Sequence, residues 1–355
     1  MNLFENMKES ENIENGVVFK ITDYIEFDLS WEEKQCRQLG VNFSYYQLKT
    51  APSDEIIRKV GDADFLLVNM AKMTAEVIAG LERTKVIVRH GIGYDNLDVE
   101  AATQHGIICA NQPTASSEDV AEQAIMLMLA VYRKIQIQRS ILRNSIEQGK
   151  WLFDPIKPMH RMSGKTLGIV GCGNIGSIVL RKMKNFGMRI LACDPYLPKE
   201  RLEELGIVHT PLEEVVSEAD IVTAHVPVTE ETRGMFDERL LRLMKKSAVL
   251  INTSRGPIVK VNDLARVLKD GVLAGVGIDV YDTEPPTPDY SLLGMENVVL
   301  TPHLAWYSEE GGWDIRHMIM DDLKAFLEGK SPRSVLNPEV FSSPKLKMKL
   351  HKTFR

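Results

Sequence analysis

Two side chains of this 355-residue sequence are of the types that the reduction of a 2-oxo acid requires. Hydride addition to a ketone needs a cation that holds the neighbouring carboxylate and polarises the carbonyl, and an acid that protonates the oxygen. Arg255, in the segment NTSRG, and His303, in the segment TPH, supply these groups. A carboxylate beside the histidine would stabilise the imidazolium, and Glu284 is the candidate. The sequence therefore predicts a catalytic set of Arg255, Glu284 and His303.

Each of these three residues also has an ordinary structural explanation. An arginine after a strand is commonly a solvated or helix-capping charge, a glutamate before two prolines is commonly loop surface, and a histidine after Thr-Pro is commonly structural. Catalysis is favoured because all three follow predicted strands, whose carboxyl ends form the ligand-binding edge of a doubly wound sheet. Spacing alone does not show that Glu284 meets His303.

A glycine-rich segment predicts a dinucleotide site. Residues 166–170 are strand-like, residues 171–176 read GCGNIG, and residues 177–186 are helix-like. Gly171 permits a tight turn, Gly173 lets the backbone approach a pyrophosphate, and Gly176 lets helix and strand pack closely. Asn174 and Ile175 complete the loop, at a helix start that offers N–H groups to an anion.

An acidic residue at the end of the next strand selects the cofactor. Asp194 follows the strand-like residues 189–193 and lies 18 positions after Gly176. Its carboxylate would accept hydrogen bonds from the adenosine ribose and would repel a 2′-phosphate, so NAD is favoured over NADP. The alternative is a glycine turn without a ligand, but the order of strand, glycines, helix and acid favours binding.

Alternating strand-like and helix-like segments predict two α/β domains. Six strand candidates form a doubly wound (Rossmann) cofactor domain: 166–171, 189–194, 220–226, 248–252, 275–280 and 298–300. A smaller, flavodoxin-like domain has strand candidates at 65–70, 86–89 and 107–110, with helices beginning near Ser53, Thr74 and Asp98. A long helix, in one piece or with a break, is expected from Ser116 towards Gly149.

The helical segment 308–328 follows the last strand of the cofactor domain and needs apolar surface to cover, so it is expected to pack on the first domain. The predicted domains are therefore a discontinuous substrate domain, 16–113 with 304–340, and a cofactor domain, 114–303. Residues 1–15 and 341–355 are predicted to be loosely held tails.

Composition restricts the partners. Lys and Arg total 43 against 49 for Asp and Glu, a formal net charge of -6, so nucleic acid is not an expected partner. No signal pattern or bilayer-length apolar run is present, so we expect no membrane contact. The four cysteines are widely spaced, which indicates thiols in a cytoplasmic protein, and the eight histidines lack metal-ligand spacing, so no metal is predicted.

Several motifs together resemble the D-isomer-specific 2-hydroxyacid dehydrogenase family, from about residue 61 to 338. They are RHGIGYDN at 89–96, the glycine loop with Asp194, HVP at 225–227, TSRG at 253–256, the segment 279–286, and PH at 302–303. The resemblance implies that Arg255 binds the substrate, that Glu284 pairs with the general acid/base His303, and that Asp279 lies near the nicotinamide. It also implies further cofactor contacts at Val226, Pro227, Thr253 and Ser254, beside Arg255 and His303.

The resemblance also implies substrate contacts and a homodimer. The loop Gly91-Ile92-Gly93 resembles one that offers backbone N–H groups to the substrate carboxylate. Lys72 matches a lysine of the family's phosphoglycerate branch, but the Arg-Ser pair that precedes this lysine in that branch is missing here. A homodimer is implied through the cofactor domain, for which the helix after Ser116 is a candidate interface element.

The substrate stays open among small 2-oxo acids, including glyoxylate, hydroxypyruvate and a phosphoglycerate-type acid. The segment 301–309, TPHLAWYSE, also resembles C-terminal binding proteins, which are dehydrogenase-like corepressors. Trp306 would then contact the apolar end of a substrate, or it would merely fill a domain interface. An NAD(H)-sensing scaffold is therefore the alternative function.

Overall fold

The computed structural model describes residues 16–350, which form two compact units. The described part of unit 1 is 16–116 with 309–350, and unit 2 is 117–308. The chain passes between the units at Ser116 and at Ser308, three and five residues beyond the boundaries predicted from the sequence.

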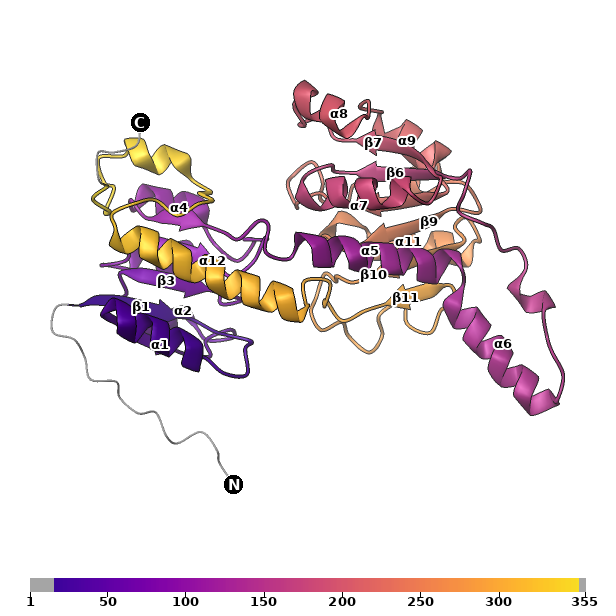
Figure 1. Ribbon diagram of the computed structural model, residues 1–355. Coiled ribbons are helices and arrows are strands. Elements are labelled where there is room, and N and C mark those ends of the chain that lie inside the picture. The colour runs from indigo at the N-terminus through magenta and orange to yellow at the C-terminus, as the bar shows by residue number, and fades with distance from the viewer. Residues whose placement is uncertain (1–15, 351–355) are drawn as a thin grey trace. The chain divides into compact units, whose positions relative to one another are not determined.

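Unit 1 is built on a parallel five-stranded sheet (Figure 1). Its strands are β1 (Val17–Ile21), β2 (Val41–Tyr45), β3 (Phe65–Val68), β4 (Val86–Arg89) and β5 (Ile108–Ala110). Their order, β2-β1-β3-β4-β5, is the flavodoxin-like order, which confirms the predicted fold of this unit. Its helices are α1 (Ser30–Leu39), α2 (Ser53–Val60), α3 (Ala75–Ala79), α4 (Val99–Gln104), α12 (Glu309–Leu327) and the 3-10 helix η3 (Pro338–Ser342).

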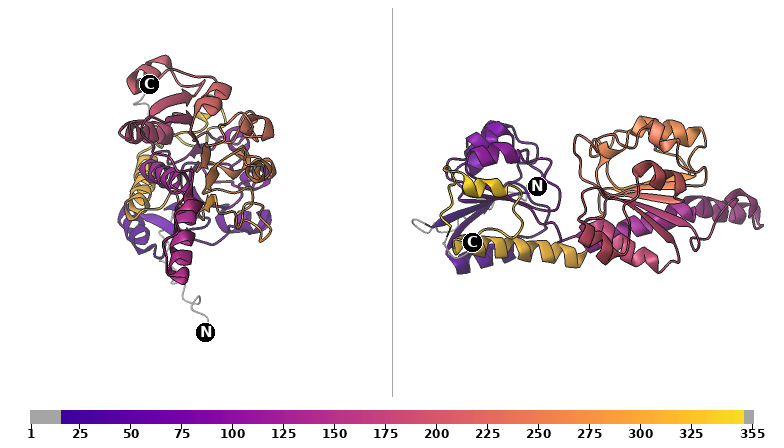
Figure 2. Two further views of the ribbon diagram at one scale, coloured as in Figure 1. Left: turned by 90° about the vertical axis from the view of Figure 1, so that its right-hand side faces the viewer. Right: turned by 90° about the horizontal axis from the view of Figure 1, so that it is seen from above.

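Helix α12 runs along the sheet of unit 1 (Figure 2). It belongs to this unit because its apolar side chains complete one of the unit's two cores. Ile315, Ile319 and Leu323 are buried with Phe19 of β1 and Phe65 of β3. A helix encoded after the second unit thus covers the sheet of the first, which makes unit 1 discontinuous in sequence.

The prediction of a loose tail from residue 341 is wrong for residues 341–350. Met348 is 4% exposed within the core that α12 completes, and the Lys347 ammonium donates to the carbonyls of Leu81 and Glu82 at 2.7 and 3.2 Å. Apolar residues that lie between the lysines hold this segment on unit 1. The charge pattern alone did not indicate this packing. The predicted tails 1–15 and 351–355 lie outside the described residues.

Unit 2 is built on a parallel six-stranded sheet, and all six predicted strands are present. They are β6 (Thr166–Val170), β7 (Arg189–Cys193), β8 (Ile221–Ala224), β9 (Val249–Asn252), β10 (Gly275–Ile278) and β11 (Val298–Leu300). The order is β11-β10-β9-β8-β6-β7, and an isolated parallel bridge joins His209 to Ala192 outside β7. This is the doubly wound arrangement predicted from the sequence. The position beyond β7, where such a sheet has a further strand, holds only this one bridge.

Helices cover both faces of this sheet, and α6 with η1 projects away from it (Figure 1). The helices of unit 2 are α5 (Ser117–Tyr132), α6 (Ile135–Gln148), η1 (Asp154–Ile156), α7 (Asn174–Lys184), α8 (Lys199–Leu205), α9 (Leu212–Glu218), α10 (Glu238–Leu241), η2 (Gly256–Ile258) and α11 (Val261–Lys269). The predicted long helix is broken between α5 and α6, where Lys134 has a positive φ of 54°. No helix within residues 16–350 is long and apolar enough to cross a lipid bilayer.

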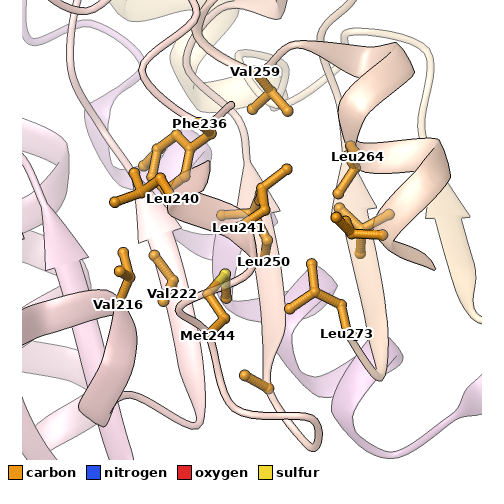
Figure 3. Packing of buried hydrophobic residues seen from close by; sticks show 14 of the residues in the cluster. Val216, Val222, Phe236, Leu240, Leu241, Met244, Leu250, Val259, Leu264 and Leu273 are labelled. Carbon is orange, nitrogen blue, oxygen red and sulfur yellow. The ribbon is translucent and has the colours of Figure 1, made fainter. Parts of the chain in front are cut away.

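The core on the α9–α11 face fixes the segment that follows Arg255. Val259, which follows η2, is buried with Phe236 and Leu264 (Figure 3), and Ile258 belongs to the same cluster. The Phe236 N–H donates to the Ile258 carbonyl at 3.1 Å, and the Gly234 N–H donates to the Pro257 carbonyl at 2.8 Å. The backbone after Arg255 is thereby bonded to the chain that leads into α10.

Replacement Phe236→Ala is expected to lower the free energy of unfolding by about 3–5 kcal/mol, because it removes a fully buried ring from this core. Urea unfolding of the full chain measures the loss. The matched control is Leu243→Ala, since Leu243 is 42% exposed. Equal losses in the two variants would contradict the assignment of Phe236 to the core.

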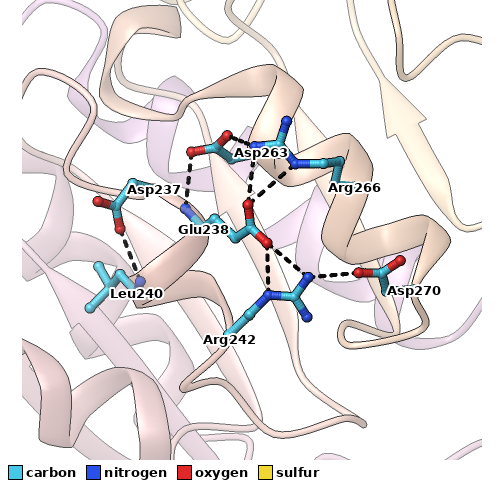
Figure 4. Close-up of polar contacts among 7 residues, drawn as sticks. All are labelled: Asp237, Glu238, Leu240, Arg242, Asp263, Arg266 and Asp270. Atoms are coloured by element: carbon cyan, nitrogen blue, oxygen red, sulfur yellow. Dashed lines mark hydrogen bonds and ion pairs between the residues drawn. The ribbon is translucent and has the colours of Figure 1, made fainter.

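A charged network on the surface joins α10 to α11 (Figure 4). The Glu238 N–H donates to the Asp263 carboxylate at 3.1 Å, and the Glu238 side chain pairs with Arg266 at 3.0 Å. Arg242 links Glu238 to Asp270 at 2.8 and 2.7 Å. Exposed pairs of this kind contribute little each, so the network orients the two helices more than it stabilises them.

Candidate active site

His303 and Glu284 form a hydrogen-bonded pair. Nδ1 of His303 lies 2.7 Å from Oε2 of Glu284, and the side chains are 35% and 31% exposed. The other carboxylate oxygen of Glu284 accepts the Tyr281 N–H at 3.0 Å, so both oxygens have fixed partners. The structure thus brings together two residues whose spacing in the sequence gave no indication of contact.

Glu284 is held as a carboxylate. Partial burial acts to raise its pKa, but the hydrogen bonds from His303 and the Tyr281 N–H, with the charges of His303 and Arg255, lower the pKa below its usual value. A carboxylate with this pKa stays ionised from neutral into moderately acidic solution. It therefore offers a negative charge to the imidazole throughout that range.

Arg255 is presented by a loop that Asn252 organises. The Asn252 side chain donates to the Arg255 carbonyl at 2.8 Å and accepts from the N–H and hydroxyl of Ser254 at 3.1 and 2.8 Å. A Cβ on Gly256 would lie 2.1 Å from the Tyr281 carbonyl carbon, so only glycine lets this loop pack against the Glu284 segment. From the sequence Asn252 was expected only as the last residue of a strand, without a role in the site, although an amide that ends a buried strand was a usable signal.

The glycine loop fits a dinucleotide. A Cβ on Gly176 would lie 2.0 Å from the Gly171 carbonyl oxygen, whereas a Cβ on Gly173 would meet nothing within 4 Å. Gly176 is therefore needed for packing, and Gly173 leaves open space at the N-terminus of α7, where an anion is favoured. Asn174 and Ile175 begin α7, three residues earlier than predicted.

Asp194 lies against this loop. Its Oδ2 accepts the Cys172 N–H at 2.8 Å, and its Oδ1 accepts the Tyr196 N–H at 3.2 Å. The carboxylate therefore stands at the end of β7 beside the turn at Gly171, where φ is +91°. This placement suits recognition of a ribose diol and disfavours a phosphate in its place.

Four polar residues form a row across the carboxyl edge of the unit 2 sheet. His225, Thr253, Asp279 and Thr301 follow β8, β9, β10 and β11 directly, and the strand registers place them side by side. Gln123 of α5 donates to the Thr301 hydroxyl at 3.1 Å, so the row lies on the face that α5 covers. We call these four residues the edge row.

Asp279 is the fully buried member of the edge row, and its bonds are to the segment that carries His303. Its carboxylate accepts the Thr301 hydroxyl at 2.5 Å and the N–H groups of Leu304 and Ala305 at 3.2 and 3.0 Å. The assignment of Asp279 to the nicotinamide stays a prediction, as do those of Val226, Pro227, Thr253 and Ser254 to the cofactor.

His225 is the member of the edge row for which no role is predicted from the sequence. Its Nε2 lies 2.9 Å from the Thr223 hydroxyl, while Nδ1 is buried and has no hydrogen-bond partner among the described residues. Burial lowers the pKa of His225 to about 4 from 6.5. The ring is therefore neutral at pH 7.

This pKa predicts an acid-dependent loss of stability. The unfolded chain takes up the His225 proton near pH 6.5 and the folded chain only near pH 4, so stability falls as the pH drops through that window, by about 3 kcal/mol in total. His225→Asn removes this contribution. Urea unfolding at pH 7 and pH 4.5 should show a smaller decrease for the variant than for the parent, and equal decreases would contradict the prediction.

The predicted substrate contacts of unit 1 lie on two braced loops. The Asn96 side chain donates to the carbonyls of Asn69 and Ala71 at 3.0 and 2.8 Å, beside Lys72. The Asn111 side chain donates to the Ile92 carbonyl at 2.7 Å, between Gly91 and Gly93. The roles of Lys72 and of the loop 91–93 in substrate binding stay predictions.

Comparisons with known proteins identify the family of the chain. Residues 125–305 match the model of the D-isomer specific 2-hydroxyacid dehydrogenase, NAD binding domain. A glyoxylate reductase of Korarchaeum cryptofilum is 38% identical over 326 residues, covering 90% of this chain and 92% of that protein. A D-3-phosphoglycerate dehydrogenase of Methanocaldococcus jannaschii is 39% identical over 80% of this chain, which spans only 53% of that relative.

A solved structure with a similar fold carries a bound dinucleotide. D-lactate dehydrogenase of Aquifex aeolicus, complexed with NAD and lactic acid, matches with a TM-score of 0.77 and 28% identity. The match covers 88% of this chain and 96% of that one. Together, the glycine loop, Asp194 and these matches identify the cofactor as NAD.

Proposed function

Because the chain belongs to the D-isomer specific 2-hydroxyacid dehydrogenase family, we propose that it interconverts a small 2-oxo acid and its D-2-hydroxy acid with Arg255, Glu284 and His303 as catalytic residues. It is an NAD-dependent oxidoreductase that acts on a CH–OH group, and the scaffold alternative is not favoured. The observation that carries the residue assignment is the 2.7 Å pair of His303 and Glu284.

Each of the three side chains has a distinct role in the reduction. NADH supplies the hydride when bound. The Arg255 guanidinium holds the substrate carboxylate and polarises the C2 carbonyl. His303, whose Nδ1 faces Glu284, gives a proton from Nε2 to the C2 oxygen, and the Glu284 carboxylate stabilises the imidazolium before that transfer.

Glyoxylate is the first substrate to test. The similarity to a glyoxylate reductase extends over nine-tenths of both chains, whereas the similarity to a phosphoglycerate dehydrogenase covers about half of that relative. The absence of the Arg-Ser pair before Lys72 also argues against a phosphorylated substrate. We therefore propose glyoxylate or hydroxypyruvate ahead of 3-phosphohydroxypyruvate.

Steady-state oxidation of NADH with a panel of 2-oxo acids tests this proposal. We expect turnover with glyoxylate or hydroxypyruvate, and weaker turnover with pyruvate and the phosphorylated acid. Tight NADH binding without turnover on any member of the panel would overturn the proposal and restore the scaffold.

An exposed apolar surface supports the proposed homodimer. Only Ser145 is buried in α6, while Leu142 and Ile146 are 48% and 73% exposed. Beyond the helix, Trp151 and Phe153 stack on each other and are 70% and 68% exposed. A surface of this kind indicates a protein partner, and a second copy of the chain is the simplest one. Light scattering should give a dimer mass, and a monomer at micromolar concentration would contradict it.

We also propose a cytoplasmic location. All four cysteines are buried thiols: Cys36, Cys109, Cys172 and Cys193. Burial raises the pKa of Cys36, Cys109 and Cys172 to about 12, so their thiols are unreactive, as suits a protein of a reducing compartment.

A further inference from the structure

His303 has an unusual backbone conformation. Its φ is +54°, in the left-handed region, and Lys134 is the only other non-glycine residue within 16–350 that has a positive φ. A side chain with a Cβ adopts this conformation at an energetic cost, and it persists only where neighbouring groups hold it. The residue proposed as the proton donor is therefore held by its surroundings.

On the N-terminal side of His303, the Thr301 carbonyl accepts two hydrogen bonds. The His303 N–H donates to that carbonyl at 3.1 Å, and the Tyr281 hydroxyl donates to it at 2.7 Å. On the C-terminal side, the buried Asp279 carboxylate accepts the N–H groups of Leu304 and Ala305. These contacts fix the chain before and after His303, and because the Leu304 N–H shares a peptide plane with the His303 carbonyl, that carbonyl points its oxygen at one further group.

That group is the indole of Trp306, whose Nε1–H donates to the His303 carbonyl at 2.9 Å. We propose that Trp306 is a positioning residue: its indole N–H holds the left-handed backbone of His303 and thereby keeps the imidazole against Glu284. The inference rests on the proposed function of His303. It differs from both roles considered from the sequence, since substrate contact and interface filling use the apolar ring and not the N–H.

The geometry explains why the N–H has an effect on the imidazole. Rotation of the His303 carbonyl is coupled to φ and ψ of that residue, so a change there redirects Cβ and the ring it carries. Among residues 16–350 the hydrogen-bond partner of the ring is the Glu284 carboxylate, 2.7 Å away. Without the indole bond, the peptide between His303 and Leu304 keeps its bond to Asp279 and loses the one to Trp306. The left-handed backbone is then less restrained, and the ring loses orientation toward the reacting oxygen.

One variant separates the Trp306 N–H from its aromatic ring, and a second variant serves as its control. Trp306→Phe keeps an aromatic ring and removes the donor, and Leu304→Ala removes a neighbouring side chain that is 49% exposed while keeping its backbone bond to Asp279. For Trp306→Phe we expect kcat to fall by about 10- to 100-fold with KM little changed, because misplacement of a catalytic group lowers kcat. For Leu304→Ala we expect kcat to stay unchanged.

A second measurement does not depend on turnover. Nitrogen-15 spectra of histidine-labelled protein report the Nδ1–Glu284 hydrogen bond of His303, whose signals are assigned by comparison with His303→Ala. In Trp306→Phe we expect the signature of this bond to weaken, with NADH affinity unchanged.

Two results would overturn the inference: a rise in KM at constant kcat, which would make Trp306 a substrate wall, or an unaltered His303 spectrum in Trp306→Phe. Absence of turnover in the parent chain would instead reject the proposed function, while the spectrum would still decide whether Trp306 orients His303.

Discussion

His303→Ala is expected to lower kcat for 2-oxo acid reduction by about 10²- to 10⁴-fold, the range that a positioned general acid contributes. The side chain removed is the one that pairs with Glu284 at 2.7 Å. NADH affinity should stay close to that of the parent, because the glycine loop and Asp194 lie on other strands of the sheet. Stopped-flow single-turnover kinetics and a fluorescence titration with NADH measure the two quantities.

A matched control for this variant is His160→Ala, since His160 is an exposed histidine of the same unit. It should leave kcat unchanged. Glu284→Gln keeps a hydrogen-bond acceptor beside Nδ1 but removes the charge, so its kcat should lie between those of the parent and His303→Ala. Parent-like turnover in His303→Ala would show that another group donates the proton.

Gly173→Ala is expected to weaken NADH binding by about 10- to 100-fold without loss of stability. The added Cβ meets no protein atom within 4 Å, so the folded chain accommodates it, but it enters the space where a pyrophosphate would approach the start of α7. Such a loss corresponds to about 1.4–2.7 kcal/mol of binding free energy. NADH titration and thermal unfolding, run on one preparation, separate affinity from stability.

Two further glycines calibrate that result. Gly312→Ala also places a Cβ in open space, but on α12 of unit 1, and should change neither quantity. Gly176→Ala places a Cβ 2.0 Å from the Gly171 carbonyl oxygen and should lower the melting temperature as well as the affinity. An unchanged Kd in Gly173→Ala would mean that the dinucleotide does not bind along this loop.

Strong local signals made much of the fold predictable. Four of the six strands of unit 2 are fully buried runs, and all six are followed by or end in a glycine or a polar residue. The glycine loop carries its own conformational requirements. The strands β1 and β2 and the helix α1 were not predicted. Both strands are in large part half-buried and carry polar residues, Lys20 in β1 and Asn42 and Ser44 in β2, and α1 carries few apolar residues. Long-range packing, not propensity, determines these elements.

The candidate site was predictable as a set of residue types and not as a geometry. Arg255 and His303 were found because the chemistry requires their types, whereas their supports Asn252, Tyr281 and Trp306 act through hydrogen bonds that no spacing encodes. The Glu284 contact likewise depends on a loop of 19 residues between β10 and β11, numbered 279–297, whose path only the folded chain defines.

The positions of the edge-row residues depend on the register of the strands in the unit 2 sheet. Because parallel ladders align His225, Thr253, Asp279 and Thr301, the connections between the strands are free to lengthen or shorten during evolution without moving these four positions. A deletion of one residue inside β11 has the opposite effect: it turns Thr301 to the other face of the sheet and takes His303 with it. Lineages of this enzyme should therefore exclude length variation from their strands and tolerate it in the loops that carry no site residue.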